Sequence, residues 1–388
     1  MIKAEFFIQL IGAAFFLILN IYLVKQGFSD PEIANFISYR FLAVMLLAFP
    51  LGVYIKGKPL KPFFILGGVG VPVIAITLIL AVQYGLHNYL PVLFIFWGIS
   101  LTLFQVSSLP YVMRNTASEN QSHAISLNYA THSFGTILSG LFIFCAGQFM
   151  PEIDEGKVLL LISCCGFVGL YFLLKMDIDI VVPVKDKLQW KSYDWTILIK
   201  AIAPTLIIAI GAGLTIPFIN LFFFHNFEID SSGFAVIGGV ASVLVAVLAL
   251  LVPNLKSKLG FKKGITYTQS IAVVALVALA TTEFFNDHWW ALPLAVMCFW
   301  IRTPLMNMAA PMTSELTMNY VGSKNQEMLS AIMAAIWSGS WFFSSQIFRF
   351  LKSEGLPYSY IFYITAVLYA FGVFMYYFLI LDYERKNE

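Results

Sequence analysis

The sequence predicts an all-α membrane protein with twelve transmembrane helices in two related six-helix bundles. Hydrophobic residues make up 60% of the chain and charged residues 11%, against roughly 25% charged in soluble domains. Apolar runs of about 20 residues, the length that a helix needs to cross a bilayer, recur along the whole chain. Because backbone amides cannot stay unpaired in lipid, these runs are expected to be helices.

One long polar stretch, 177–194, divides these runs into six before it and six after it. We therefore expect an N-terminal bundle over 1–176, a cytoplasmic linker over 177–194 and a C-terminal bundle over 195–388. The expected helices cover 4–25, 32–55, 62–84, 89–113, 122–148, 157–176, 195–224, 231–254, 264–284, 288–313, 325–351 and 358–381.

The distribution of basic residues predicts the orientation of the chain. With a cytoplasmic N-terminus, 17 of the 23 Lys and Arg fall on the inner side, as the positive-inside rule requires. An even number of spans then places both termini in the cytoplasm. We expect a plasma-membrane protein, or an inner-membrane protein if the source is a Gram-negative bacterium. The net charge of +2 gives no sign of nucleic-acid binding.

The two halves share sequence features at an offset of about 200 residues, in the same order. Since the seventh span starts on the same side as the first, the halves are expected to be parallel repeats. The matched features are Ile11–Ala14 with Asn20 against Ile210–Gly213 with Asn220, the segment 52–61 against 253–262, and 120–126 against 325–330.

This 6+6 pattern, with a long middle loop and basic 2–3 and 8–9 hinges, resembles the major facilitator superfamily over essentially the whole chain. The resemblance implies a secondary transporter that works by alternating access, with helices 1, 4, 7 and 10 around a central cavity. It also implies a gate hinge, for which the matching positions are Gly52, Lys61, Lys258, Gly260 and Lys262. Ser257 and Lys56 stand where the family's hinge has an Asp, so the family's charge-based latch is not expected here.

Arg302 is the strongest candidate for a substrate-binding residue. It falls about halfway along its span, where an unpaired Arg costs at least ~2.5 kcal/mol on insertion scales, and no carboxylate is expected at its depth. A fixed cation for an anionic group of the substrate is the preferred interpretation. The alternative is an Arg that bonds only to backbone carbonyls.

Polar residues inside other spans are further candidates, because lipid confines them to the bundle interior or a wet cavity. Gln9 and Asn20 share one face of the first span, and Asn128 and His132 share one face of the fifth. His132 could carry a proton; the alternative is a neutral His held by Asn128 in a helix–helix contact. The remaining substrate-binding candidates are Arg40, Gln105, Asn220 and Asn307.

These residues predict symport, antiport or facilitated transport of a small organic anion, with H⁺ or Na⁺ as a possible coupling ion. An exporter of amphipathic drugs or lipids is the alternative, favoured by 37 Phe and 13 Met. An intramembrane enzyme or a non-transporting receptor is more remote, because His132 has no buried acid beside it. Neither a cofactor nor a metal is expected, since the four Cys lack ligand spacing. The expected oligomeric state is a monomer.

Overall fold

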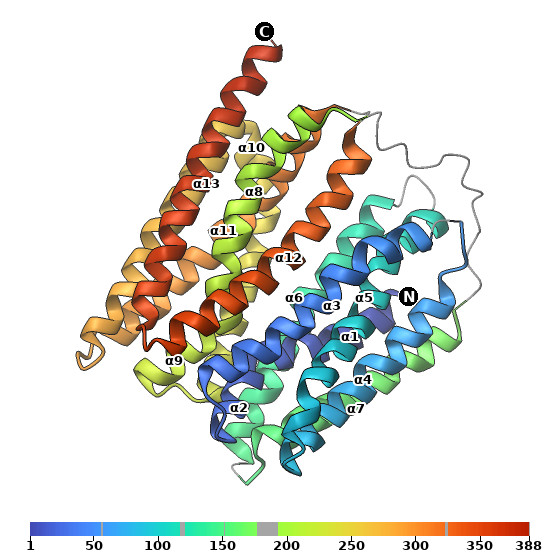
Figure 1. Ribbon diagram of the computed structural model, residues 1–388, viewed down its shortest axis with the longest axis vertical. Helices are drawn as coiled ribbons and strands as arrows, with labels where there is room; N and C mark the ends of the chain where they lie inside the picture. Colours follow the sequence, from blue (N-terminus) through green and yellow to red (C-terminus); the bar gives the residue numbers. More distant parts are fainter. Residues whose placement is uncertain (56, 117–120, 151, 177–192, 323–324, 388) are drawn as a thin grey trace. The chain divides into compact units, whose positions relative to one another are not determined.

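A computed structural model describes the chain from 1 to 388 except residues 56, 117–120, 151, 177–192, 323–324 and 388. Every regular element in these described residues is a helix (Figure 1). The α-helices are α1 (Ile2–Ala14), α2 (Asn20–Lys25), α3 (Asp30–Tyr54), α4 (Lys61–Gln83), α5 (Leu90–Asn115), α6 (Gln121–Phe149), α7 (Glu155–Leu174), α8 (Trp195–Thr215), α9 (Ile219–Phe227), α10 (Ser231–Thr281), α11 (Ala291–Val321), α12 (Gln326–Ser353) and α13 (Tyr358–Asn387).

Eleven helical segments of the described chain are long and apolar enough to cross a membrane. A π-helical turn, Phe15–Leu19, joins α1 to α2, and a 3₁₀ turn, Ile216–Phe218, joins α8 to α9, so each pair forms one span. The predicted eleventh span, α12, is not among them. Its serines lower the mean hydropathy, but Ser344 and Ser345 are fully buried against neighbouring helices.

Several predicted boundaries differ from the structure. The spans predicted over 231–254 and 264–284 both lie in α10, as two helical segments that meet at the non-helical backbone of Gly260. The span predicted over 288–313 continues to Val321 in α11, and the first span begins at Ile2. Glu315 therefore lies inside α11, whereas Glu5 lies in the first turn of α1.

Side chains placed just before the helices explain several of their starts. Ser29 and Glu32 form a capping box at the start of α3, which satisfies backbone N–H groups that have no partner within the helix. Asp154 accepts a 2.7 Å hydrogen bond from the Lys157 amide at the start of α7. Asp194 accepts bonds from the Thr196 and Ile197 amides in the same way at the start of α8.

The helices divide into two compact units. Unit 1 contains Met1–Lys187 and Ile229–Gly239, and unit 2 contains Leu188–Glu228 and Val240–Glu388. Most of the linker predicted over 177–194 lies outside the described residues. The predicted division of the chain at this linker therefore stays a prediction.

In unit 1, α1 packs against both α6 and α7, while α5 packs between α3 and α4. Small residues permit close approach of these backbones. A Cβ on Gly98 would lie 2.4 Å from the Arg40 carbonyl oxygen, and one on Gly67 would lie 2.8 Å from that of Ser100. An ion pair between Lys25 and Glu155 joins the end of α2 to the start of α7, and Ser231 donates to the same carboxylate at 3.1 Å.

In unit 2, α8 is the central helix and packs against α12 and α13. The glycines of its repeated Ile-Gly-Ala-Gly motif make this contact possible. A Cβ on Gly211 would meet the Tyr369 ring of α13 at 3.0 Å, and one on Gly213 would meet Ser344 of α12 at 2.7 Å. The matched motif at Ile210–Gly213 is therefore used for helix packing.

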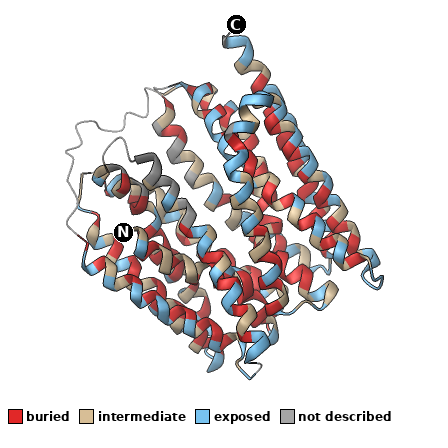
Figure 2. Ribbon diagram, turned by 180° about the vertical axis from the view of Figure 1, so that it is seen from behind, coloured by how far each residue is buried: buried red, intermediate tan, exposed pale blue. Residues whose placement is uncertain are grey.

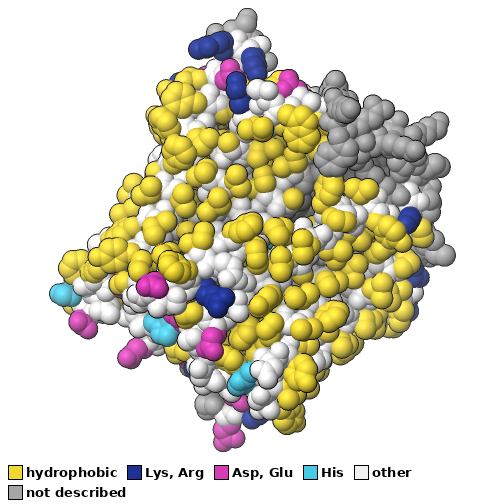
Figure 3. All heavy atoms as spheres, viewed as in Figure 1, with side chains coloured by type: hydrophobic (Ala, Val, Ile, Leu, Met, Phe, Trp, Pro, Cys, Tyr) yellow, Lys and Arg dark blue, Asp and Glu magenta, His cyan; other side chains and the backbone are white. Residues whose placement is uncertain are grey.

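Buried and exposed residues alternate along the helices, so that each helix turns one side to its neighbours (Figure 2). The exposed sides are apolar: Leu250 is 80% and Val367 69% exposed. Figure 3 shows hydrophobic side chains over most of the visible face. A surface of this kind suits lipid rather than water.

Candidate substrate-pathway residues

Arg302 lies deep inside unit 2. Its side chain projects from α11 and is only 5% exposed. One guanidinium nitrogen, Nη2, donates a 2.7 Å hydrogen bond to the Tyr369 hydroxyl of α13, and the guanidinium carbon lies 5.6 Å from the centre of the Tyr369 ring. Nε is buried without a hydrogen-bond partner. The contact that holds Arg302 is therefore to a neutral phenol.

Arg40 is held differently, in unit 1. Its guanidinium carbon lies 4.6 Å from the centre of the Trp97 ring on α5 and 5.3 Å from that of Phe41, distances typical of cation–π contacts. Its Nε also lacks a partner. Within the residues that the structure describes, neither Arg40 nor Arg302 has an Asp or Glu oxygen within 4.0 Å. Arg302 is thus buried and Arg40 half-buried, each without a described carboxylate beside it.

A polar cluster that we did not predict lies in unit 1, around Glu5. This carboxyl group is only 4% exposed. Its Oε2 lies 2.8 Å from the Ser108 hydroxyl of α5, which in turn lies 3.1 Å from Oδ1 of Asn128 on α6. Gln9, one turn further along α1, also hydrogen bonds to Glu5. Two predicted site residues, Gln9 and Asn128, are thus connected through Glu5 and Ser108.

The signal for this cluster was present in the sequence. Glu5 and Gln9 are four residues apart and share a helix face. The sequence predicts a first span that starts at residue 4, which puts Glu5 at its very beginning. The helix begins two residues earlier, and the face that carries Glu5 turns toward α5 and α6.

The other candidates are scattered. His132 is exposed, and Asn128 contacts Ser108 instead of the His132 ring. Gln105 and Asn307 are exposed, and the Asn307 amide donates to the Thr303 carbonyl of its own helix. The two asparagines of the repeat, Asn20 and Asn220, are 4% and 1% exposed. Asn20 directly follows the π-helical turn, and Asn220 comes two residues after the end of the 3₁₀ turn.

The basic hinge segments are fastened to neighbouring helices. In unit 1, Gly52 lies within α3, and the Lys61 ammonium donates to the Leu174 and Met176 carbonyls at the end of α7. Arg114 of α5 donates to the Ile55 and Lys58 carbonyls, at 3.3 and 2.8 Å.

In unit 2 the hinge is held by an ion pair between Lys256 and Glu315 of α11. Lys258 and Gly260 are exposed, and the Lys262 ammonium lies 5.0 Å from the centre of the Tyr377 ring. Ser257 holds the position where the family's hinge has an Asp. Glu315 supplies a carboxylate to this segment from a different helix.

The architecture is that of a polytopic membrane protein, and comparison with known proteins gives its class. A family model of the Major Facilitator Superfamily matches residues 4–345. The chain belongs to this superfamily, whose members are transporters rather than enzymes. The predicted membrane protein of the major facilitator fold is therefore confirmed. A comparison of the sequence with curated proteins finds no match.

Solved structures of diverse transporters share the fold. A bacterial homologue of the iron transporter ferroportin, in its inward-facing state, has a TM-score of 0.72 at 15% identity and covers 97% of each chain. The nucleoside transporter NupG has a TM-score of 0.71 at 14% identity over 98% of each chain. A D-xylose–proton symporter has a TM-score of 0.72 at 14% identity over 97% of this chain and 95% of the other.

Proposed function

We propose that this chain is a secondary transporter that moves a small organic anion by alternating access, with Arg302 as the cation that binds the anionic group. The observation that carries the proposal is the surroundings of Arg302. Its guanidinium is almost completely buried, its contact to Tyr369 leaves the charge unneutralised, and no described carboxylate lies within 4.0 Å. A buried charge is expensive unless something pairs with it.

The chemistry of the guanidinium favours a planar anion. Arg carries five N–H donors in a fixed fork, and its charge is permanent. One donor is used by Tyr369 and Nε has no partner. A carboxylate, sulfonate or phosphate accepts two parallel hydrogen bonds from such a fork. A neutral sugar or an organic cation would leave the charge unpaired.

The alternative substrate class is an amphipathic drug or lipid, which the abundance of Phe and Met favours. The two classes differ in what they need from the protein. An organic anion requires a cation in contact with it, whereas an amphipathic cation is best matched by a carboxylate and apolar walls. The buried Arg302, with the half-buried Arg40, favours the anion.

A screen of solutes tests this assignment. Purified full-length protein is heated with mono- and dicarboxylates, sulfonates, phosphate esters, amines and uncharged sugars. The proposal expects the unfolding midpoint to rise with one of the anion groups and to stay unchanged with amines and sugars. Stabilisation by amphipathic amines without any response to anions would favour the exporter. The proposed plasma-membrane location, cytoplasmic termini and monomeric state are separate expectations, checked by labelling and by light scattering.

We further propose that a proton is the coupling ion and that Glu5 carries it, in place of His132. Glu5 Oε2 and Asn128 Oδ1 both lie within hydrogen-bond distance of the Ser108 hydroxyl, which has a single hydrogen to donate. If Glu5 is protonated, it donates to Ser108, and Ser108 donates to Asn128. Every oxygen then has a correctly matched partner, whereas His132 is exposed and stands outside this chain.

The cations around this end of unit 1 have other partners. Lys3 lies over the Phe172 ring, Lys175 donates to the Tyr171 hydroxyl, and Arg114 and Lys61 bind backbone carbonyls. The α-amino group of Met1, one turn before Glu5, is the charge that faces the carboxyl group. A protonated carboxyl group needs no neutralising cation, which fits these surroundings.

Exchange and accumulation assays in proteoliposomes separate the two candidates. Glu5→Gln should abolish accumulation driven by a pH gradient and keep substrate exchange, while His132→Gln should keep both. An infrared carbonyl band of a protonated carboxylic acid should be present in the wild type and absent in Glu5→Gln. An ionised Glu5 with the Asn128 amide turned over would lack that band. An N-terminally extended chain controls for the Met1 amino group.

A further inference from the structure

A furrow lies on unit 1 between α6 and α7. Both helices pack along α1, but they touch each other very little. The surface of α1 therefore forms the floor of the furrow, with α6 and α7 as its walls. On α6 the exposed residues Leu127, Phe134, Leu138 and Leu141 follow each other at separations of seven, four and three, which is one helix face.

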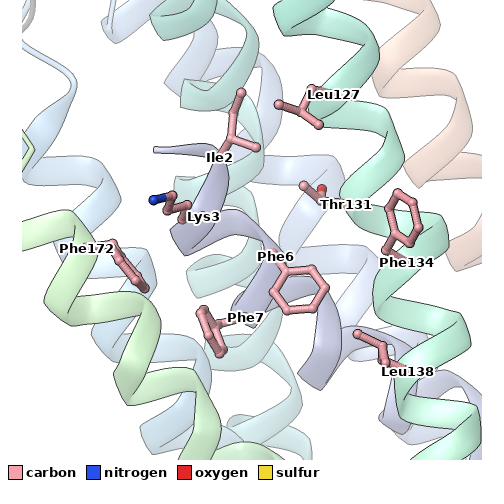
Figure 4. Close-up of a pocket in the computed structure, with 9 residues that line it drawn as sticks. All are labelled: Ile2, Lys3, Phe6, Phe7, Leu127, Thr131, Phe134, Leu138 and Phe172. Atoms are coloured by element: carbon pink, nitrogen blue, oxygen red, sulfur yellow. The ribbon is translucent and has the colours of Figure 1, made fainter.

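The furrow holds a hollow of about 440 Å³ (Figure 4). This volume lies within the range of ~300–1,000 Å³ that small-molecule sites occupy. Phe6 and Phe7 of α1 line its floor, and Phe134 and Leu138 line the α6 side. The Thr131 hydroxyl donates to the Asn128 carbonyl of its own helix at 2.6 Å, so it does not make the hollow polar. The lining is apolar except at one end.

That end carries cations. Lys3 lines the hollow and is exposed, with its ammonium 5.7 Å from the centre of the Phe172 ring on α7. Lys175 follows Phe172 by three residues on the same helix, which puts it on the next turn of the same face, and it too is exposed. Lys3 lies one residue inside the start of the first candidate span. This is the depth at which lysines reach lipid phosphates.

We propose that this furrow is a binding site for an anionic phospholipid, with one acyl chain in the apolar hollow and the phosphate at Lys3. The charge complementarity selects the occupant. A detergent-like or zwitterionic lipid would fill the hollow equally well but would gain less from Lys3. An anionic partner protein is disfavoured, because the hollow lies on a membrane span where lipid is the surrounding medium.

Lipid titration of the purified full-length chain in a neutral maltoside detergent tests the site. The unfolding midpoint is followed against phosphatidylglycerol and phosphatidylcholine with the same acyl chains. Phosphatidylglycerol should act at the lower concentration. Lys3→Gln should weaken the response to phosphatidylglycerol about five-fold, the equivalent of about 1 kcal/mol for one lysine near an anionic headgroup. Lys263→Gln, an exposed lysine of unit 2, should leave the response unchanged.

A second variant tests the hollow itself. Leu138 is 44% exposed, so Leu138→Trp can fill the hollow without disturbing the helix contacts. This variant should lose the rise in unfolding midpoint with both lipids. Glycerol phosphate, which has the headgroup but no acyl chain, should have no effect. Equal responses to the two lipids, or an unchanged response in Lys3→Gln, would overturn the headgroup assignment. A full response in Leu138→Trp would overturn the hollow as the acyl-chain site.

Discussion

Replacing Arg302 removes a cation that is buried in unit 2 and bonded to the Tyr369 hydroxyl. Two effects on the free energy of unfolding oppose each other. The Tyr369 hydroxyl is left buried without a partner, which costs about 1–3 kcal/mol. The protein no longer holds a charge at mid-helix, which cost about 2.5–3.5 kcal/mol on insertion scales. We therefore expect stability to be unchanged or to rise by up to about 2 kcal/mol.

Binding should respond in the opposite way. A planar anion loses two charge-assisted hydrogen bonds at about 1.5–3 kcal/mol each, so that its affinity falls by at least about a hundredfold. Arg302→Lys keeps the charge but loses the fork, and it should bind weakly. Arg302→Met fills most of the space and separates loss of charge from loss of volume. Arg302→Ala should not bind detectably.

Melting temperature and ligand affinity are measured on the same preparation of each variant. Tyr369→Phe is the matched control, because it removes the hydroxyl partner and keeps the cation; it should retain most of the binding. If Arg302 were one half of a structural pair, its loss would lower stability by about 3–5 kcal/mol. Lower stability together with retained binding in Arg302→Ala would make Arg302 structural and refute the reasoning.

Three other predictions concern topology and packing. Lys263 and Asp287 are exposed and flank the span predicted over 264–284. In a background without native cysteines, single cysteines in their place should react with an impermeant reagent from opposite sides of right-side-out vesicles. Labelling of both from outside would contradict the orientation. Gly98→Ala should lower stability by about 1–3 kcal/mol, because the new Cβ would sit 2.4 Å from the Arg40 carbonyl oxygen. Gly12→Ala is the control: the nearest atom to its Cβ lies at 4.0 Å, so the change should be neutral or stabilising by up to about 1 kcal/mol. Lys61→Gln removes a cation from the carboxyl end of α7 and should lower the free energy of unfolding by about 0.3–1 kcal/mol. An unchanged unfolding midpoint would mean that water replaces this cap.

The helical fold could be predicted because apolar length is a local property of the sequence. Any run of about 20 apolar residues must be helical in lipid, whatever its neighbours are. The irregular spans were harder to delimit. The α12 serines reduce its hydropathy, yet its opening segment at 325–330 matches 120–126 in the repeat. In α10, the direct connection between the two predicted spans depends on the backbone conformation of Gly260, which composition does not reveal.

The site depends on contacts between residues far apart in the chain. Arg302 could be found alone, because a buried cation is unusual wherever it occurs, but its partner Tyr369 lies 67 residues away. Glu5 meets Ser108 across 103 residues. Helix periodicity gives the face of a single helix and does not say which other helix that face meets. His132, selected by depth, is exposed because depth does not fix the direction of a side chain.

The turn at Gly260 has a consequence for how this chain can be modified. It has φ +65° and ψ −176°, and a side chain at a positive φ is strained. Helical residues continue on both sides of it without a loop. By contrast, at the matching connection in unit 1, α3 ends at Tyr54 and α4 begins only at Lys61. A reporter domain or epitope inserted near Gly57 should therefore be tolerated. The same insertion at Gly260 would separate two helices whose relative direction is set by that single residue.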